Sequence, residues 1–410
     1  MREFLESRTA PQDNAAPLYF AALADLCPEM DFVYPPAVWQ ARLPQVQALS
    51  ERIGNLADED KLLARAISLE DVQRVLAAAR PALEKIDNAQ QNTNCVFVTG
   101  LSFEALLPHA QSARQIARLA QLQLFYSSSN GDFDETESTA RRTLRLSRDL
   151  RPRGGLICQL VSIAMDAVVL NAIKNFTLRQ PDLKPEHCVR LIALIADHQR
   201  LAIEPFGEGV RFEYITMRNA LDDFFQGRRQ LDKAAFRQSF GKDPPPPNKL
   251  SKEKELTVLD QEFATVLAIG ARPYHEVLAS AWGEQLRNRL KNHVQTGNAV
   301  VVPALLPAFN LGLEATARDR ARLDGVRCLI AVRRYELTHR RLPDDLQTAV
   351  REAGIAEVPM DPYCDQPMRY RIHNSKPIVY SIGSDQKDDG GLVDWNAGQQ
   401  PGDFVFQIGQ

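Results

Sequence analysis

The sequence predicts a mainly α-helical protein that ends in a small α+β unit, and two observations carry this prediction. Apolar residues recur at helical spacing through most of the chain before residue 342. After residue 342, prolines separate short runs of β-type residues, namely MRYRI at 368–372, PIVYSI at 377–382 and DFVFQI at 403–408. We therefore expect packed helical hairpins over 1–296. Over 297–410 we expect a long helix followed by a three-stranded antiparallel sheet.

Helix signals follow one another along the N-terminal region. Ser68 and Asp71 have the spacing of a capping box at the start of a helix over 68–87. The clearest unit is a helical hairpin over 112–150, whose turn contains Asn130-Gly131. Further helices are expected over 15–26, 155–176 and 185–203. The hairpin has the pattern of a tetratricopeptide (TPR) unit, but no second copy recurs at a fixed period, so a TPR-like array and an irregular bundle both stay open.

Residues 240–254, GKDPPPPNKLSKEKE, interrupt the helical pattern. Four consecutive prolines favour an extended polyproline II segment, so we expect a surface loop here. A spacer is the simpler interpretation, and a ligand for a proline-recognition domain is the alternative. Helical spacing resumes over 255–296.

Composition argues against nucleic acid as a partner and against a membrane span. The 410 residues carry a formal net charge of −3 and 7% of them are aromatic, so neither a basic field nor a platform for stacking bases is expected. The longest apolar run, 299–309, contains two prolines and is shorter than the roughly 20 residues that a spanning helix needs. The first fourteen residues lack the apolar stretch of a signal peptide. We therefore expect contact with a membrane only through an anchor absent from this chain.

Familiar metal and catalytic motifs are absent from the sequence. The six cysteines lie too far apart for a CxxC pair, and no two histidines have the spacing of an HExxH helix. GxSxG, GxGxxG and Walker sequences are missing as well. We expect the cysteines of the predicted helices to be buried free thiols, although their even number leaves disulfides open. His187 and His198 are expected to be solvated or capping residues.

The C-terminal region carries three consecutive segments of a known type. The predicted long helix ends in Tyr335, His339 and RRLPDDL, VPMDPYCDQPMRYRI follows at 358–372, and YSIGSDQKDDGG follows at 380–391. In this order, residues 299–410 resemble the type II secretion major pseudopilin family, the short filament subunits related to type IV pilins. The whole chain looks like large helical proteins of planctomycete-type bacteria that carry this module and have no assigned function. The resemblance implies a pseudopilin-like fold for the C-terminal unit.

In that family the last of these segments is a calcium-binding loop. The resemblance makes Asp385 the first acidic ligand and brings the carbonyl of Ile382 to the site. Asp388, Asp389 and Asp394 are the candidates for the remaining carboxylates. Calcium prefers roughly six to eight oxygen ligands of these kinds. The alternative interpretation is an exposed turn whose aspartates cap backbone amides.

These observations predict a non-catalytic, calcium-stabilised scaffold or protein-binding protein related to secretion or to the cell envelope. Its helical region would offer a concave surface to a protein or peptide. An exported or envelope location is favoured, and a cytoplasmic one follows if the given N-terminus is native. One alternative is a hydrolase with an acidic site near Glu204–Glu213. Another is a genuine secretion-apparatus subunit, which would need the hydrophobic N-terminal helix that helical hairpins replace here.

Overall fold

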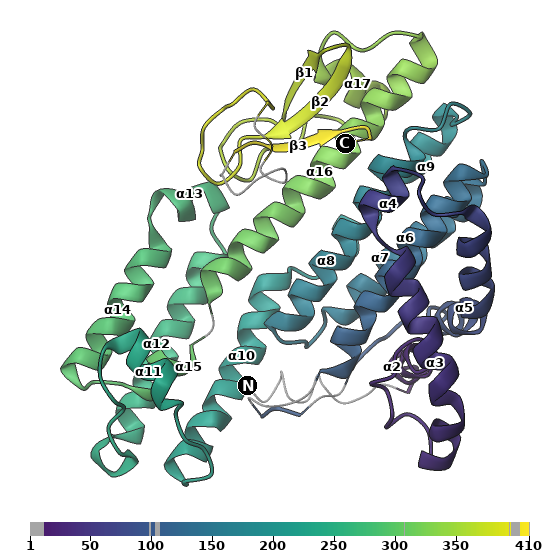
Figure 1. Ribbon diagram of the computed structural model, residues 1–410. Helices are drawn as coiled ribbons and strands as arrows, with labels where there is room; N and C mark the ends of the chain where they lie inside the picture. Colours follow the sequence, from purple (N-terminus) through teal and green to yellow (C-terminus); the bar gives the residue numbers. More distant parts are fainter. Residues whose placement is uncertain are drawn as a thin grey trace.

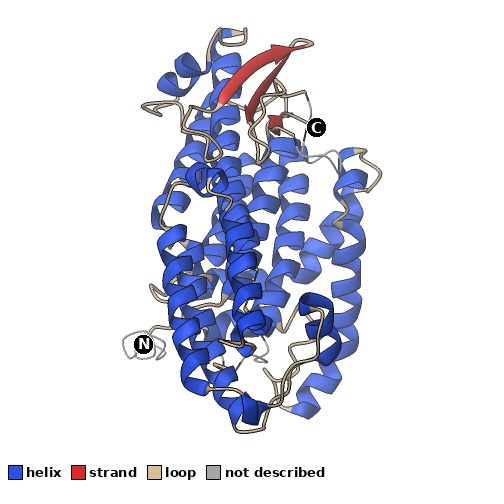
Figure 2. Cartoon of the chain, turned by 90° about the vertical axis from the view of Figure 1, so that its left-hand side faces the viewer, coloured by secondary structure: helices blue, strands red, loops and turns tan. Residues whose placement is uncertain are grey.

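The longest helix, α16 (Phe309–His339), runs through the middle of the molecule and connects its helical region to a small sheet. The computed structural model describes residues 12–97, 100–102, 107–306, 308–392, 394 and 402–409. Within these residues the chain is mainly helical and has one three-stranded antiparallel sheet near its C-terminus, as the sequence predicts. Figure 2 shows the helices lying roughly side by side, with the sheet at one end of the bundle.

The elements follow in chain order. The first group is α2 (Ala16–Leu23), α3 (Pro36–Leu56), α4 (Glu59–Leu63), α5 (Leu69–Ala89), α6 (Pro108–Ser129), α7 (Phe133–Leu150), α8 (Leu156–Ala172), the π-helical turn η1 (Ile173–Thr177) and α9 (Pro185–Leu201). The second group is α10 (Pro205–Phe225), α11 (Lys233–Phe240), the 3-10 turn η2 (Pro247–Lys249), α12 (Lys252–Gly270), α13 (Tyr274–Ala279), α14 (Trp282–Thr296) and α15 (Val301–Leu305). After α16 come α17 (Leu346–Glu352), β1 (Arg369–His373), β2 (Lys376–Ser381) and β3 (Phe404–Gln407).

Local sequence explains where several helices begin. The Ser68 hydroxyl accepts the backbone N–H of Asp71 and caps α5, which confirms that predicted start. In the hairpin of α6 and α7, Gly131 adopts the left-handed conformation with φ of 69°. Asp132 follows it and accepts the backbone N–H of Glu135 at the start of α7. The predicted hairpin over 112–150 is therefore confirmed.

The predicted loop over 240–254 is shorter than expected. Its proline segment lies outside the α-helices, but α12 already begins at Lys252 because Ser251 caps it. The apolar run at 299–309 is likewise divided between α15 and the start of α16. The buried carboxylate of Glu255 accepts the backbone N–H groups of Val300, Val301 and Val302, and so anchors α15 on α12.

Two apolar cores share α16. The first core extends from Tyr19 of α2, through α5 to α9 and the middle of α16, to Phe406 of β3. The second core joins α10, α12, α14 and α15 around Phe206 and Phe263, and includes Phe309 at the start of α16. In Figure 1 these cores correspond to the right and left limbs of the helical region. The predicted domain division at residue 297 stays a prediction, and α16 contributes to the cores on both of its sides.

The sheet lies against the second half of α16. Its order is β1-β2-β3, and both neighbouring pairs are antiparallel. Asn374 and Ser375 have φ of 51° and 60° and form the predicted hairpin turn between β1 and β2. β3 reaches the helix through Phe406, whose ring lies where a Cβ at Gly325 would be. A glycine at this position therefore lets the sheet approach the helix backbone closely.

By length and composition, one helical stretch among the described residues, Leu156–Thr177 of α8 and η1, is apolar enough to cross a membrane. Most of its residues are buried against α6, α7, α10 and α16 in this fold, which is typical of the core helix of a globular protein. All six cysteines lie within the described residues, and all are free thiols.

The close approach at Gly325 predicts opposite effects for two glycine-to-alanine changes. Gly325→Ala should lower the free energy of unfolding by about 1–3 kcal/mol, because the new methyl group overlaps the buried ring of Phe406. Gly54→Ala in α3 is the matched control, since no atom lies within 4 Å of its added Cβ. That change should raise the free energy of unfolding by about 0.5–1 kcal/mol. Urea unfolding followed by circular dichroism measures both, and a Gly325→Ala variant as stable as Gly54→Ala would contradict the packing.

Candidate functional site

The predicted calcium loop follows β2, and the structure gives several of its residues protein partners. The backbone N–H of Ile382 donates to Asp361 at 2.9 Å, while the direction of its carbonyl stays a prediction. Asp385 accepts the backbone N–H of Lys387 at 3.1 Å, within its own turn. Asp388 accepts the Tyr380 hydroxyl at 3.1 Å and pairs with Arg369 at 2.9 Å. Asp385 and Asp388 therefore already stabilise the loop.

Asp403, which the sequence analysis missed, lies beside this loop. Its backbone pairs with that of Asp394 in an isolated bridge, and its side chain accepts the N–H of Gly391 at 2.6 Å. The residue is fully buried, and Oδ1 accepts no hydrogen bond from a described group. Burial, with the nearby charges of Asp388 and Asp389, raises the pKa of Asp403 to about 6.

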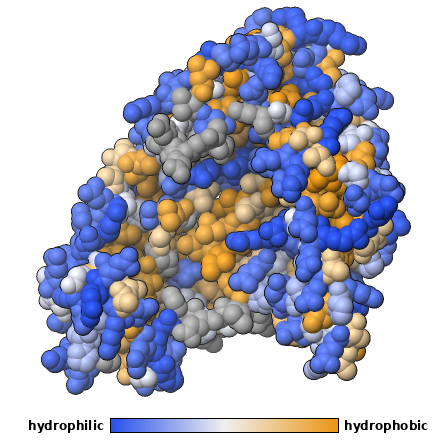
Figure 3. Space-filling model, in the orientation of Figure 1, coloured by the Kyte–Doolittle hydropathy of each residue, from blue (hydrophilic) through white to orange (hydrophobic). Residues whose placement is uncertain are grey.

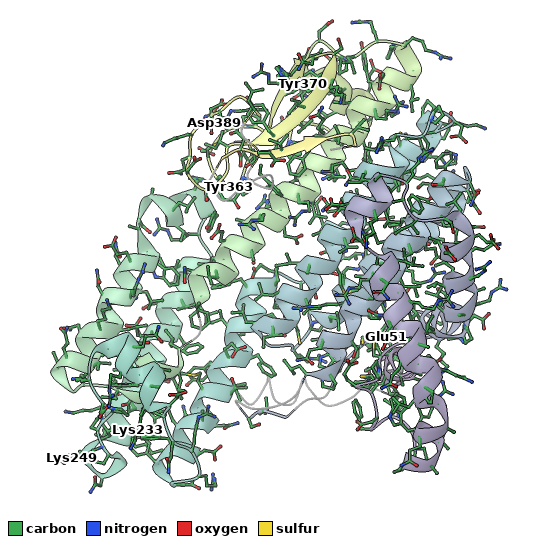
Figure 4. All side chains as sticks on the ribbon, viewed as in Figure 1. Glu51, Lys233, Lys249, Tyr363, Tyr370 and Asp389 are labelled. Atoms are coloured by element: carbon green, nitrogen blue, oxygen red, sulfur yellow. The ribbon has the colours of Figure 1, made fainter. Side chains whose placement is uncertain are left out.

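The five predicted ligands do not form a finished metal centre. Among the described residues, no three Asp, Glu, His or Cys side chains converge in the way that a metal ion requires. The bridge between Asp394 and Asp403 nevertheless joins the two ends of the excursion after β2. Figure 4 shows Asp389 on the C-terminal unit, together with Tyr363 and Tyr370 and far from Glu51 on α3. The calcium site stays a prediction, with Asp403 as an additional ligand candidate.

Asp361 holds the start of the loop in place. Its fully buried carboxylate accepts the Ser381 hydroxyl at 2.7 Å and the N–H groups of Ile382 and Tyr363 at 2.9 and 3.0 Å. Arg369 lies 3.6 Å from the same carboxylate. A carboxylate with this many donors connects the segment before β1 to the end of β2.

The acids of the Glu204–Glu213 segment accept hydrogen bonds from backbone groups, and Glu204 also lines a pocket between α9, α10 and α16. Glu204 accepts the N–H groups of Phe206 and Gly207 at 2.8 and 2.7 Å and caps α10. Glu208 accepts the N–H of Arg153 at 2.5 Å. Glu213 accepts the N–H of Leu156 at 3.0 Å, and burial raises its pKa. These contacts favour a structural role for the acids of the predicted hydrolase site.

A buried cluster of charged side chains lies beside the same segment. It consists of Arg151 before α8, Asp166 on α8, His198 on α9 and Asp319 on α16, each at most 4% exposed. Asp166 contacts Arg151 at 2.6 Å and His198 at 3.1 Å, and Arg151 lies 3.6 Å from Asp319. The expectation that His198 is solvated or capping is therefore wrong, because the imidazole is fully buried and bonded to the buried carboxylate of Asp166.

The two carboxylates of this cluster have different acidities. Burial alone would raise the pKa of Asp166, but the neighbouring His198 and Arg151 outweigh this effect and the pKa is lowered. Burial and the adjacent Asp166 raise the pKa of Asp319 to about 7. Of the two acids, Asp319 therefore holds a proton more readily, and Asp166 is the one that favours the ionised form.

Asp319 opens onto a pocket of about 510 Å³ between α9, α10 and α16. The pocket is lined by Arg151, His198, Gln199, Ala202, Ile203, Glu204, Pro205, Thr316, Asp319, Arg320, Leu323, Asp324 and Arg327. Thr316, Asp319, Leu323 and Arg327 follow the helical spacing of three and four residues that places them on one face of α16. That spacing was visible in the sequence, but nothing there showed that this face encloses a cavity.

A second surface feature is the uncovered stripe of α8. Ile157 and Leu160 are 54% and 37% exposed, and the exposed Ala164 and half-buried Val168 continue the same face. Leu311 at the start of α16 is 59% exposed. The face of the molecule drawn in Figure 3 is hollowed at its centre, where apolar surface gathers between more polar parts.

Comparison of the chain with family models, curated proteins and solved structures finds no match in any of the three. The resemblance of residues 299–410 to pseudopilins therefore stays a prediction.

The role of Asp361 predicts a large effect from a single change. Asp361→Ala should lower the free energy of unfolding of the C-terminal unit by about 3 kcal/mol, because it leaves buried donors at Ser381 and Ile382 without an acceptor. Asp365→Ala is the control on the same segment, since Asp365 is exposed, and its effect should stay within about 0.5 kcal/mol. Hydrogen exchange of the β2 amides measures the local stability. Equal exchange in the two variants would show that Asp361 does not hold the loop.

Proposed function

We propose that this chain is a non-catalytic scaffold that binds a protein or peptide through its helical region and is stabilised by calcium at its C-terminal unit. The uncovered apolar stripe on α8 is the observation that carries the binding proposal. A role in secretion or in the cell envelope follows from the resemblance of the C-terminal region to pseudopilins and belongs to the same proposal.

The stripe has the form of a docking surface for a helix. α8 is the most membrane-like helix of the described chain, and its other faces are covered by α6, α7, α10 and α16. From Ile157 to Val168 the stripe is about 16 Å long at 1.5 Å per residue, or about three helical turns. Large apolar groups that stay exposed together commonly mark an interaction site. An amphipathic helix with apolar residues at spacings of three and four would cover this stripe.

The fold is compatible with the finer assignments made from the sequence. The hairpin of α6 and α7 keeps the helix-turn-helix pattern of a tetratricopeptide unit, although the limbs as a whole resemble an irregular bundle more than a regular array. A long helix followed by a three-stranded antiparallel sheet is also what a pseudopilin-like unit would contain. We therefore assign the C-terminal unit to this type as part of the proposal.

The calcium proposal gains support from Asp403. A buried carboxylate with an unused oxygen and two nearby acids is unfavourable unless a cation or proton compensates it. Calcium held by Asp385, Asp388, Asp389, Asp394 and the carbonyl of Ile382, with Asp403 added, would supply that compensation. The ion would connect the end of β2 to the start of β3. Its role would be structural.

The calcium proposal predicts a stabilisation that depends on the ion. Millimolar calcium should raise the melting temperature, because the ion binds the folded loop and not the unfolded chain. Asp385→Ala and Asp403→Asn should each remove most of this rise, whereas Asp365→Ala, which changes an exposed acid outside the loop, should keep it. Differential scanning calorimetry with and without calcium measures the effect. An unchanged melting temperature of the native chain would end the calcium proposal.

The binding proposal predicts that one charge on the stripe abolishes peptide binding. Helical peptides selected by display against the full chain should bind Leu160→Glu at least about tenfold more weakly, because the carboxylate would be buried against apolar side chains. Leu201→Glu is the control, since Leu201 is 53% exposed on α9 and lies outside the stripe. Fluorescence anisotropy gives the dissociation constants. Peptides that bind both variants equally would show that the stripe is not the docking surface.

A further inference from the structure

The pocket at Asp319 is distinct from the surface on which the proposed partner binds. It is lined by side chains of α9, α10, α16 and the connections before α8 and α10, and none of the stripe residues of α8 takes part. On α16 the pocket uses Thr316, Asp319 and Leu323, whereas Leu311 belongs to the apolar surface. A function of this pocket is therefore independent of the proposed scaffold function. Its volume of about 510 Å³ is in the range of small-molecule sites.

The acids at the pocket are largely occupied by protein groups. Both oxygens of Glu204 accept backbone N–H groups of α10. Asp324 accepts Gln199 at 3.0 Å and lies 3.4 Å from Arg327. These bonds hold the two carboxylates in place without neutralising them, so an anion binds here only where Arg320 and Arg327 outweigh their charge.

The cations at the pocket keep unused capacity. Arg320 is exposed, and its charge acts on the nearby Asp324 without a contact-distance ion pair among the described residues. Arg327 is bonded through one terminal nitrogen to Gln199 and Asp324, while its buried Nε has no partner among the described groups. The two arginines lie seven residues apart, about 10 Å along one face of α16. Guanidinium groups placed in this way match the oxygens of carboxylates or phosphates.

The floor of the pocket contains a polar atom that the described protein leaves unsatisfied. Asp319 is 4% exposed, and its Oδ1 has no hydrogen-bond partner among the described groups. The Nε of the neighbouring Arg151, which is 3% exposed, has none either. Buried polar atoms in folded proteins nearly always have a partner. Both atoms belong to side chains that line the pocket but are closed to solvent, so a ligand would reach the Asp319 carboxyl only with a rotation of that side chain.

We propose that this pocket binds a small organic molecule that carries oxyanion groups, with Arg320 and Arg327 holding the oxyanions and Asp319 hydrogen-bonded to the ligand at the floor. Carboxylate and phosphate groups share the required chemistry, and the experiment below distinguishes them. The ligand is held in a cavity between helices that belong to both limbs, and it would therefore connect them.

The acidity of Asp319 is consistent with an anionic ligand. Charged or titratable groups face its carboxyl from each neighbouring element: Arg151 before α8, Asp166 on α8, His198 on α9 and Arg322 on α16. With its pKa raised to about 7, Asp319 is mainly neutral at pH 6 and mainly negative at pH 8. The neutral acid can donate a hydrogen bond to an oxyanion, whereas the carboxylate repels it. Binding should therefore weaken as the pH rises from 6 to 8.

Calorimetric titration of the full chain tests the proposal. The probes are oxalate, a dicarboxylate that is fully ionised at both pH values, and inorganic phosphate. The native chain should bind at least one of them, and the tighter one identifies the preferred oxyanion. Arg320→Ala should weaken binding at least about tenfold. Arg287→Ala is the control, because Arg287 is exposed on α14 and outside the pocket, and it should bind like the native chain.

The pH dependence separates a ligand at Asp319 from one at the rim. Oxalate binding to the native chain should weaken about three- to tenfold between pH 6 and pH 8, and Asp319→Asn, which keeps the size of the side chain, should remove most of that change. Failure of both probes to bind at 10 mM would overturn the proposal. Equal affinities for Arg320→Ala and Arg287→Ala would overturn it as well. The diamine putrescine serves as a cationic probe. If putrescine bound more tightly than oxalate, and Asp319→Asn abolished putrescine binding, the pocket would be a cation site and the proposal would be overturned.

Discussion

The helical packing depends on one buried cluster of charged side chains, which consists of Arg151, Asp166, His198 and Asp319. One residue comes from each of the α7–α8 connection, α8, α9 and α16, so the cluster forms only when these elements are together. Buried ions lose their hydration, and each needs its partner to offset that loss. A packing that moved α16 away would leave the buried Arg151 without the second of its two carboxylate neighbours. The cluster therefore selects one arrangement of the helices, even if its net contribution to stability is small.

α16 carries this constraint to the rest of the molecule. Its first residues belong to the core of the left limb, its middle to the core of the right limb, and its second half supports the sheet through Gly325. Residues of the C-terminal unit are in turn joined by Asp361 and by the bridge between Asp394 and Asp403. The pocket of Asp319 is lined by α16, and α16 also packs on α8, so a ligand in the pocket and a partner on α8 would bind to elements in direct contact, which offers a physical route for coupling between them.

The sequence predicts the regular parts of this fold well because they depend on local patterns. The cap at Ser68, the turn after Asn130 and the hairpin turn at Asn374 are specified by neighbouring residues. The site residues depend on distant partners. Asp319 looks like an ordinary surface acid until α9 and the α7–α8 connection enclose it, and α16 has charged residues around its whole circumference. Asp403 could have been predicted from the register of β2 and β3, because the pairing of Ser381 with Phe404 brings Asp403 beside Ile382. The sequence alone did not give that register.

The burial of α8 has a consequence for the folding of the protein during its synthesis on the ribosome. α8 and η1 end at Thr177, whereas α16, which covers one of their faces, begins only at Phe309. At a synthesis rate of roughly 5–20 residues per second, on the order of ten seconds separate the two on the ribosome. During that interval α8, the most apolar helix of the nascent chain, lacks the contact with α16 that buries one of its faces in the folded protein. Chaperones, or a membrane insertion machinery that reads it as a span, would encounter Leu156–Thr177 before α16 does.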